Sequence, residues 1–287
     1  MTASRIANRL DLHGVAYTLD AACASSLLAV EQAMRELTAG RLDLALAGGV
    51  HLSHDPSFWS VFCQLGALSR EGVVRPFDRR ADGILIGEGI GFVVLKRTAD
   101  ARRDGDRIYA RLRGAGSASD GRVSSLMTPD VGGQRLALSR AWESAAGLSR
   151  SEVGLIEAHG TGTPAGDQAE LSTIAAFFGK DGDPGVLGSV KSMIGHAMPA
   201  AGMAGLIKAA LAVHHGVLPP SLHSTEPHPS LAETRFRVIP TAEPWTSQRR
   251  VAAVNALGFG GINAHLILEN ETARHGVPVR HGRPSGR

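Results

Sequence analysis

Short apolar runs rich in β-branched residues alternate along the chain with segments of helical periodicity, and glycine turns separate them. Runs of this kind form sheets that helices cover, so we predict an α/β protein with a largely buried, mixed sheet. Strands are expected within residues 15–20, 42–50, 89–97, 153–163, 185–196 and 251–270, with a second series of elements beginning at residues 107–121. Helices are expected after residue 23 as far as 40, and over 132–146, 167–178 and 199–214.

Composition narrows the functional classes. With 287 residues, 43% of them hydrophobic, the chain can bury the core of one or two domains. A net charge of +3 does not indicate nucleic acid binding, and no apolar run approaches the roughly 20 residues of a membrane span. Only two cysteines are present, which excludes a disulfide framework or a multi-cysteine metal site and favours a reducing, cytoplasmic location.

One cysteine lies at a point that favours reactivity. The stretch "YTLDAACASSLLAV" begins as a strand and ends as a helix, with Cys23 at the junction. Unpaired N–H groups and the dipole at a helix N-terminus favour the thiolate, so Cys23 is a candidate nucleophile that should be acylated and alkylated before Cys63. The alternative is that Cys23 is a small buried filler. Cys63, flanked by bulky apolar residues in "WSVFCQLGAL", is predicted to lie in the core.

Two histidines follow strands in glycine-rich sequence, His159 in "EAHGTGTPAGD" and His196 in "GSVKSMIGHAMPAAG". A histidine at the carboxyl end of a strand can reach a substrate over the cleft where α/β folds bind ligands, although either could be purely structural. The histidine pairs 51/54 and 214/215 resemble metal-ligand spacings, but neither has a carboxylate partner at metalloenzyme spacing. No HExxH, phosphate-binding lysine loop, G-x-G-x-x-G or G-x-S-x-G sequence occurs, so we predict no metal site.

A glycine turn completes the set of candidate elements. In "ALGFGGINAH", the glycines 258, 260 and 261 let backbone N–H groups approach a ligand closely. Such a turn can form an oxyanion hole, and it can equally be a plain hairpin turn between two strands.

Taken together, these segments resemble the β-ketoacyl synthases, and in particular the ketosynthase domains of type I polyketide synthases. The resemblance rests on "DAACASS", "EAHGTGTPAGDQAE", "GSVKSMIGH", "AAGMAGLIKAAL" and "GFGGINAH", in the order of that family and across almost the whole chain. It implies a thiolase-like layered fold (α/β/α/β/α), a homodimer, and decarboxylative condensation of acyl thioesters in polyketide or fatty-acid-like biosynthesis.

The resemblance also implies a division of the chain. Residues 1–106 would be a remnant of the N-terminal ketosynthase half, and 107–270 a complete C-terminal half. Residues 271–287, polar and rich in proline and glycine, are expected to form a disordered tail. Because family members have further strands and helices before the cysteine motif, we expect the N-terminal half to be incomplete and the chain alone to be poorly soluble or inactive.

Roles for individual residues follow from the same resemblance. Cys23 matches the nucleophile that accepts an acyl chain, and His159 and His196 match the pair that drives malonyl decarboxylation and condensation. Lys191 matches the lysine that supports this pair. Phe259 matches an aromatic gate of the acyl pocket, and its N–H, with that of Cys23, would form the oxyanion hole.

Further positions carry expectations of their own. Thr161 and Thr163 match residues that hydrogen-bond the phosphopantetheine arm of an acyl carrier protein, with turn capping as the alternative. The motif acids Asp167 and Glu170 are predicted to be structural. No bound metal or redox cofactor is implied. The chain departs from the family pattern at Met193, where asparagine is usual, and at Ile262, where threonine is usual.

Three hypotheses remain open at the level of sequence. The chain is an active condensing enzyme, a catalytically silent dimer partner, or an inactive fragment. Retention of Cys23 with both histidines favours the enzyme, because silent partners typically lack the cysteine. The acyl chain, the extender unit and the polyketide subclass cannot be read from these residues.

Overall fold

A computed structural model describes residues 2–123, 125 and 127–271. Its helices are α1 Thr2–Arg9, α2 Ser25–Thr38, α3 Pro56–Gln64, α4 Thr98–Asp104, α5 Val131–Ser144, α6 Pro164–Phe178, α7 Lys191–Ile194 and α8 Ala201–His215. Its strands are β1 Ala45–His51, β2 Gly89–Leu95, β3 Arg111–Ser119, β4 Val153–Glu157, β5 Gly185–Gly188, β6 Val217–Leu218, β7 Phe236–Arg237, β8 Glu243–Pro244, β9 Val251–Gly258 and β10 Ile262–Glu269.

The central feature is a six-stranded mixed sheet in the order β3-β10-β9-β4-β5-β7. β10 is antiparallel to both of its neighbours, while β4 runs parallel to β9 and β5, and β5 runs parallel to β7. β1 and β2 form a separate antiparallel pair. The predicted α/β class and mixed sheet are confirmed. Every predicted strand but one is present, and the predicted helices lie within a few residues of their expected bounds.

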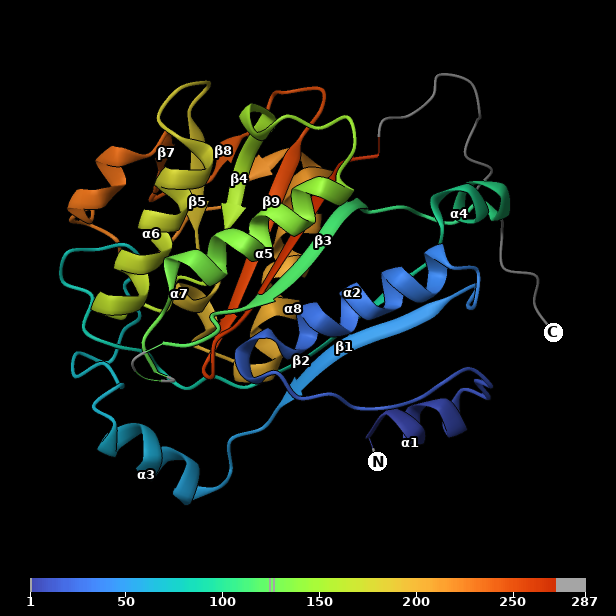
Figure 1. Cartoon of the computed structure of the whole chain (residues 1–287), viewed down its shortest axis with the longest axis horizontal. Helices are drawn as coiled ribbons and strands as arrows, with labels where there is room; N and C mark the ends of the chain where they lie inside the picture. The colour runs from blue at the N-terminus through green and yellow to red at the C-terminus, as the bar shows by residue number, and fades with distance from the viewer. Residues whose placement is uncertain (1, 124, 126, 272–287) are drawn as a thin grey trace.

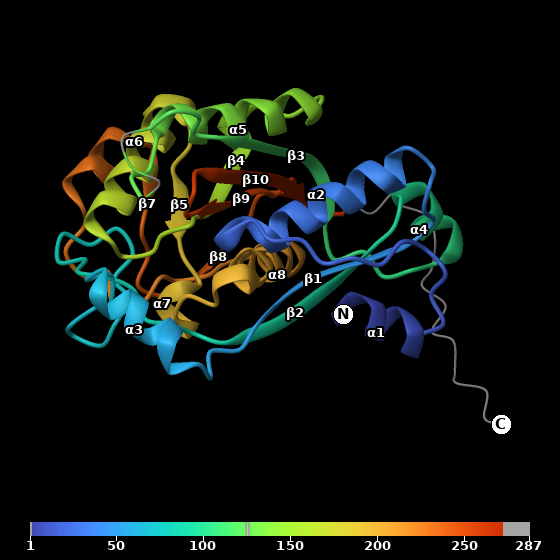
Figure 2. The same cartoon turned by 60° about the horizontal axis from the view of Figure 1, so that its bottom comes forward.

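The elements are stacked in layers (Figures 1 and 2). α5 and α6 cover one face of the six-stranded sheet, where Leu138, Leu171 and Ile174 pack on sheet residues such as Ile156. α2 and α8 cover the other face and separate that sheet from the β1–β2 pair (Figure 2). Most alanine and glycine residues of α8 are buried. Because their side chains are small, this helix can lie close to its neighbours on both sides.

The strand predicted at residues 15–20 is absent. This segment is irregular, and Val15 and Tyr17 are exposed. A strand requires a neighbour for its backbone hydrogen bonds, and a cavity of about 660 Å³ lies between this segment and β1. The prediction was wrong because apolar alternation indicates a strand but does not supply the partner that it pairs with.

The environment of Cys63 also differs from its prediction. Cys63 is exposed on α3, although we expected it in the core. Phe58 and Phe62, one helical turn apart, supply the side of α3 that packs on the protein, and the position after Phe62 points away from it. The predicted disordered tail, residues 271–287, lies outside the described residues except for Glu271, which is held by ion pairs.

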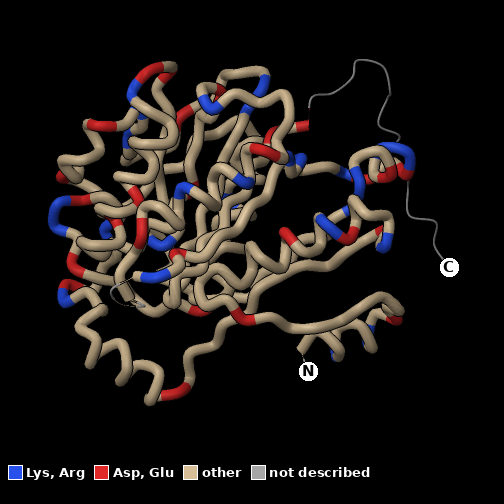
Figure 3. Tube along the Cα trace, in the orientation of Figure 1, with Lys and Arg blue, Asp and Glu red and all other residues tan. Residues whose placement is uncertain are grey.

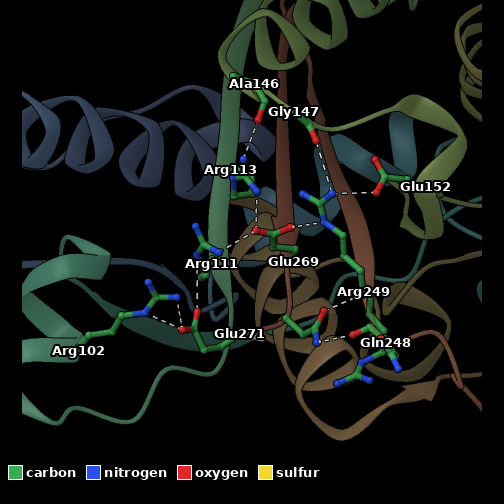
Figure 4. Close-up of polar contacts among 12 residues, drawn as sticks. Arg102, Arg111, Arg113, Ala146, Gly147, Glu152, Gln248, Arg249, Glu269 and Glu271 are labelled. Atoms are coloured by element: carbon green, nitrogen blue, oxygen red, sulfur yellow. Dashed lines mark hydrogen bonds and ion pairs between the residues drawn. The ribbon is translucent and has the colours of Figure 1, made fainter. Parts of the chain in front are cut away.

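Ion pairs fasten one end of the six-stranded sheet, at the C-terminal end of β10 (Figure 4). Glu269 is 3% exposed and pairs with three arginines, Arg111, Arg113 and Arg249. Burial raises the pKa of Glu269, but hydrogen bonds from Arg113 and Arg249 outweigh it, so the net pKa is lowered. Elsewhere basic and acidic residues are interspersed (Figure 3).

No described helix combines the length and apolarity needed to cross a bilayer.

We expect Glu269→Gln to lower the free energy of unfolding at pH 7 by about 1–3 kcal/mol, because the arginines lose a charged acceptor. A carboxylate with a lowered native pKa stabilises the fold above its unfolded pKa, and this contribution disappears as the pH falls through the native pKa. The difference between wild type and variant, measured by urea unfolding, should therefore shrink in acid. Equal stability of the two proteins at pH 7 would contradict this expectation. Glu243→Gln, in an exposed ion pair, is the control.

Hydrogen exchange should distinguish the two sheets. β2 is open to solvent, with Ile90 and Val94 more than 60% exposed, whereas β9 is buried along most of its length. We expect amides of β1 and β2 to exchange at least tenfold faster than those of β9 and β10, because sparsely covered strands open locally at lower cost. Peptide-level mass spectrometry measures both rates, and equal protection of the two sheets would show that the exposed strands do not open more easily.

Candidate active site

Cys23 occupies a tight elbow before α2. Ala22 has φ of 50°, an uncommon conformation for a residue with a Cβ, and a short 3-10 turn over Ala22–Ala24 leads into the helix. Hydrogen bonds hold the turn on both sides: Ser25 Oγ donates to Ala22 O and accepts from Ala21 N–H, and Asp20 accepts from Ala22 N–H. The elbow therefore fixes the cysteine in space before any substrate arrives.

The glycine turn between β9 and β10 lies against this elbow. A Cβ at Gly258 would lie 2.8 Å from Ala21 O and 3.3 Å from Ala22 Cβ, so only glycine permits the approach. The backbone N–H groups of Phe259 and Cys23 lie close enough to the Cys23 sulfur to lower the pKa of its thiol, against the larger raising effect of burial. Two N–H groups that converge on one point can also receive the oxygen of a tetrahedral intermediate. The turn joins the two strands as a hairpin and also brings the backbone of Phe259 beside Cys23.

His159 follows β4, and a buried carboxylate holds its loop. Glu170 accepts hydrogen bonds from the N–H groups of His159 and Gly160, both at 2.8 Å, and from Asn255 Nδ2. Asp167 accepts from the N–H groups of Phe77 and Gly162. Burial raises the pKa of Asp167 to about 7 and also raises that of Glu170. Both acids are committed to backbone groups, as a structural role requires.

His196 is held by a different set of contacts. Its N–H donates to Leu85 O, and its carbonyl accepts from Gly87 N–H. Its Nδ1 accepts from Met198 N–H at 3.1 Å, so a neutral His196 carries its proton on Nε2. Met193, at the position where the sequence departs from the family, is 42% exposed and takes no part in these bonds.

The structure brings the predicted groups together. Ligand-type atoms of Cys23, His159 and His196 all lie within 4.8 Å of one another, and the two imidazole rings meet edge-on with centroids 5.3 Å apart. Lys191 donates from Nζ to His159 O, and the same Nζ lies 3.5 Å from His159 Nδ1. None of the four residues is more than 9% exposed.

Burial dominates the electrostatics of this cluster. It lowers the pKa of both histidines well below the usual value, with Lys191 as the second cause, so the imidazoles are neutral at physiological pH. Burial also lowers the pKa of Lys191. It raises the pKa of Cys23 to about 11, against the lowering effects of Lys191 and the two N–H groups. The resting residue is therefore a thiol, not the thiolate that the helix terminus alone led us to expect.

Three clustered ligand atoms also suit a metal ion geometrically. The neighbouring Lys191, however, presents its amino group to the Nδ1 side of His159, and a protonated lysine there repels a second cation. The charge of Lys191 therefore disfavours a metal ion at this cluster.

The remaining predicted residues surround the cluster. Thr161 and Thr163 share a hydrogen bond of 2.9 Å between their hydroxyls, and Thr163 stands before α6 without capping it. Phe259 is 43% exposed, and its ring centroid lies 6.2 Å from that of Phe62. Phe62, packed with Cys23 in a small apolar cluster, was missed by the sequence analysis. Its spacing from Phe58 at i and i+4 was the available signal.

The comparisons with known proteins agree with this geometry. Residues 1–101 match the beta-ketoacyl synthase N-terminal domain, residues 109–225 the C-terminal domain, and residues 226–285 the ketoacyl-synthetase C-terminal extension. The chain is similar to the ketosynthase from module 6 of the bacillaene synthase of Bacillus subtilis 168, with 35% identity, a TM-score of 0.90 and coverage of 94% of this chain and 50% of that one. It also resembles the oxazolomycin ketosynthase domain of Streptomyces albus JA3453, with 38% identity, a TM-score of 0.92 and coverage of 96% and 50%.

Curated relatives are larger proteins. One component of the phenolphthiocerol/phthiocerol polyketide synthase of Mycobacterium tuberculosis is 43% identical over 274 residues, which are 93% of this chain and 15% of that protein. Phthioceranic/hydroxyphthioceranic acid synthase, also of Mycobacterium tuberculosis, is 43% identical over 284 residues, 97% of this chain and 13% of that one. The chain thus spans about half the length of the solved ketosynthases and under a fifth of these synthases.

The chain thus has a layered thiolase-like fold, a cysteine elbow and a buried histidine pair, and its matched segments cover nearly its whole length. The chain belongs to the β-ketoacyl synthase family, as a ketosynthase domain related to those of polyketide synthases.

The two thiols should differ in alkylation. Cys63 is exposed, whereas Cys23 is buried and, with a pKa of about 11, is ionised in only about one molecule in a thousand at pH 8. We expect iodoacetamide to modify Cys63 first, and the rate at Cys23 to rise about tenfold per pH unit between pH 7 and 10. Peptide mapping measures both rates. Faster labelling of Cys23 than Cys63 at pH 7 would restore the order expected from sequence.

Proposed function

We propose that the chain catalyses decarboxylative condensation of an acyl group with a malonyl-type extender, with Cys23 as the nucleophile. The observation that carries the proposal is the convergence of Cys23, His159, His196 and two backbone N–H groups in one buried site. The family of the chain supports the reaction class.

In the first step the Cys23 sulfur attacks a carrier-bound thioester. A new C–S bond forms to Cys23, the bond to the carrier sulfur breaks, and the thiol proton of Cys23 passes to the departing carrier thiol. The N–H groups of Cys23 and Phe259 receive the negative oxygen of the tetrahedral intermediate. Covalent capture divides one difficult condensation into two easier steps.

In the second step the malonyl unit loses CO2 and its carbanion attacks the acyl carbonyl on Cys23. The Cys23 thiolate leaves and takes up a proton, so that one proton is consumed per condensation. His196 carries its proton on Nε2, and His159, whose Nδ1 lies beside Lys191 Nζ, can do the same. Two such donors stabilise the enolate oxygen that precedes the new C–C bond, without charged imidazoles or a redox cofactor.

The substrates would arrive on a phosphopantetheine arm supplied by an acyl carrier protein or domain. The paired hydroxyls of Thr161 and Thr163, at the start of α6 and close to His159 in the chain, are proposed to hydrogen-bond this arm. Phe259, half-exposed beside Phe62, is proposed to gate the acyl pocket.

Assembly, location and internal division are also parts of the proposal. We retain a homodimer as the working form, and a division into segments 1–106 and 107–270. Two free cysteines, one of them exposed, favour a reducing, cytoplasmic compartment.

Intact-mass analysis tests the function directly. The sequence alone led us to expect an inactive chain, but the four site residues lie together within it, so we now expect activity. After incubation of the full chain with an acyl carrier protein thioester, we expect the mass of one acyl group on wild type and none on Cys23→Ala. His159→Ala and His196→Ala should still be acylated, while malonyl decarboxylation and condensation fall by about two to three orders of magnitude. The control Cys63→Ser should be acylated normally.

Two results would contradict the proposal. Loading that persists in Cys23→Ala would place the nucleophile elsewhere. Condensation at the wild-type rate in both histidine variants would remove the proposed enolate donors.

A further inference from the structure

A second buried ion pair lies behind the catalytic cluster. Glu157, the last residue of β4, is 1% exposed and lies two residues before His159. Its Oε2 is 2.8 Å from Nζ of Lys208 on α8, whose side chain is 11% exposed. Neither of these two atoms has a hydrogen-bond partner among the described residues, so their contact is an ion pair without a well-directed hydrogen bond. Burying two charges costs desolvation free energy, so stability alone does not explain why the pair is present.

The packing leaves specific room for this pair. A Cβ added at Gly205, one helical turn before Lys208, would lie 3.0 Å from Cγ of Glu157, and one at Gly188 would lie 3.8 Å from Lys208 Nζ. Larger residues at Gly205 would press on the glutamate. The small residues of α8 therefore allow the helix to approach β4 closely enough for the two charges to meet.

The other oxygen of Glu157 reaches the loop that carries Lys191. Oε1 accepts the backbone N–H of Val190 at 2.6 Å, and Val190 is the residue directly before α7 and Lys191. Lys191 in turn donates to His159 O. One carboxylate thus connects α8, the end of β4 and the start of α7, and it does so next to the lysine that touches the histidine loop.

Charge links the same groups. Burial lowers the pKa of Lys191, and four anionic or ionisable neighbours raise it. Glu157 has the largest raising effect, followed by Cys23, Glu170 and Asp167. Glu170 and Asp167 are both protonated more readily than usual, because burial raises the pKa of each. Glu157 has the largest effect of these neighbours on Lys191, and it also accepts the N–H of Val190, the residue directly before Lys191.

We propose that Glu157, anchored by Lys208, is a positioning residue that fixes the Val190–Lys191 turn and keeps Lys191 cationic beside His159 and Cys23. The pair acts through Lys191 and does not touch substrate. The inference rests on the proposed function only in taking Lys191 as part of the site, and it deepens that function by naming what sustains the charge of Lys191.

The direction in which the rate of Cys23 alkylation changes separates this role from a direct effect of Glu157 on Cys23. The ionisable groups facing Cys23 are Lys191, Asp20, His159 and His196. If Glu157 acted on Cys23 directly, removing its negative charge would favour the thiolate and speed alkylation. If it acts through Lys191, its removal weakens the cation that stabilises the thiolate, and alkylation slows.

The experiment is iodoacetamide labelling of the full chain at pH 9, followed by peptide mapping. In Glu157→Gln, which keeps the shape and an acceptor for Val190 N–H, we expect Cys23 labelling to slow by about threefold to tenfold. Labelling of the exposed Cys63 should be unchanged, which reports that the fold is intact. Glu269→Gln, the same substitution in another buried ion pair, is the matched control and should leave the Cys23 rate within twofold.

A double-mutant cycle with Lys191→Met completes the test. In that background Glu157→Gln should no longer slow Cys23 labelling, because the group through which it acts is gone. An unchanged or faster Cys23 rate in Glu157→Gln overturns the proposal. Equal slowing with and without Lys191 also overturns it, since that result marks a merely structural effect.

A second pair of variants decides the matter if Glu157→Gln does not fold. Lys208→Met should slow Cys23 labelling, and Lys208→Arg, which keeps a cation for Glu157, should restore it at least in part. Equal loss in both overturns the proposal. These labelling measurements need no acyl substrate, so they are independent of the proposed function. If Glu157 affects Cys23 labelling through Lys191 but acyl loading fails, only the condensing function is contradicted. If acyl loading succeeds but Glu157 has no such effect, only the positioning role is contradicted.

Discussion

The buried amino group of Lys191 is the interaction on which the site depends. It lies against the carbonyl and the ring of His159. It is the second cause, after burial, of the lowered pKa of both histidines. It is also the strongest influence that opposes the raised pKa of Cys23. A single charge in a dry site thus biases three neighbours at once, because the screening that water provides is absent. Much of the surrounding polar structure holds this charge and its neighbours in place.

Glycine and backbone hydrogen bonds do most of that holding. Gly258 lets the β9–β10 turn reach the cysteine elbow, and Glu170 ties down the loop of His159 through two N–H groups. Neither contact involves substrate, yet both decide where reactive atoms lie. Motif residues that carry no chemistry therefore still determine the positions of those that do.

The sequence was sufficient for the fold class, because strand and helix periods and the turns that follow them are local properties. The grouping of the site residues, Lys191 above all, came from the family resemblance. Cys23, His159, His196 and Lys191 were predicted to act together and lie together. The ionisation of Cys23 was not predictable, since a helix terminus is visible in sequence whereas burial to 4% exposure is a tertiary property. Residues 15–20 failed as a strand and Cys63 failed as a core residue for the same reason: each depends on neighbours that are distant in sequence.

The parallel pairing of β9, β4 and β5 has a mechanical consequence. Their carboxyl ends lie at one edge of one sheet, so the segments that carry Phe259, His159 and Lys191 share a stiff hydrogen-bonded base. Cys23 belongs instead to the elbow before α2, in the layer that packs on that sheet through the apolar core and touches it at the β9–β10 turn. Sliding of one layer over the other would change the separation between Cys23 and the two histidines while leaving the histidine side rigid. The reactivity of the cysteine is therefore a sensitive gauge of the fit between the two layers, and mutations in the α2–sheet contact, remote from any substrate, can tune it.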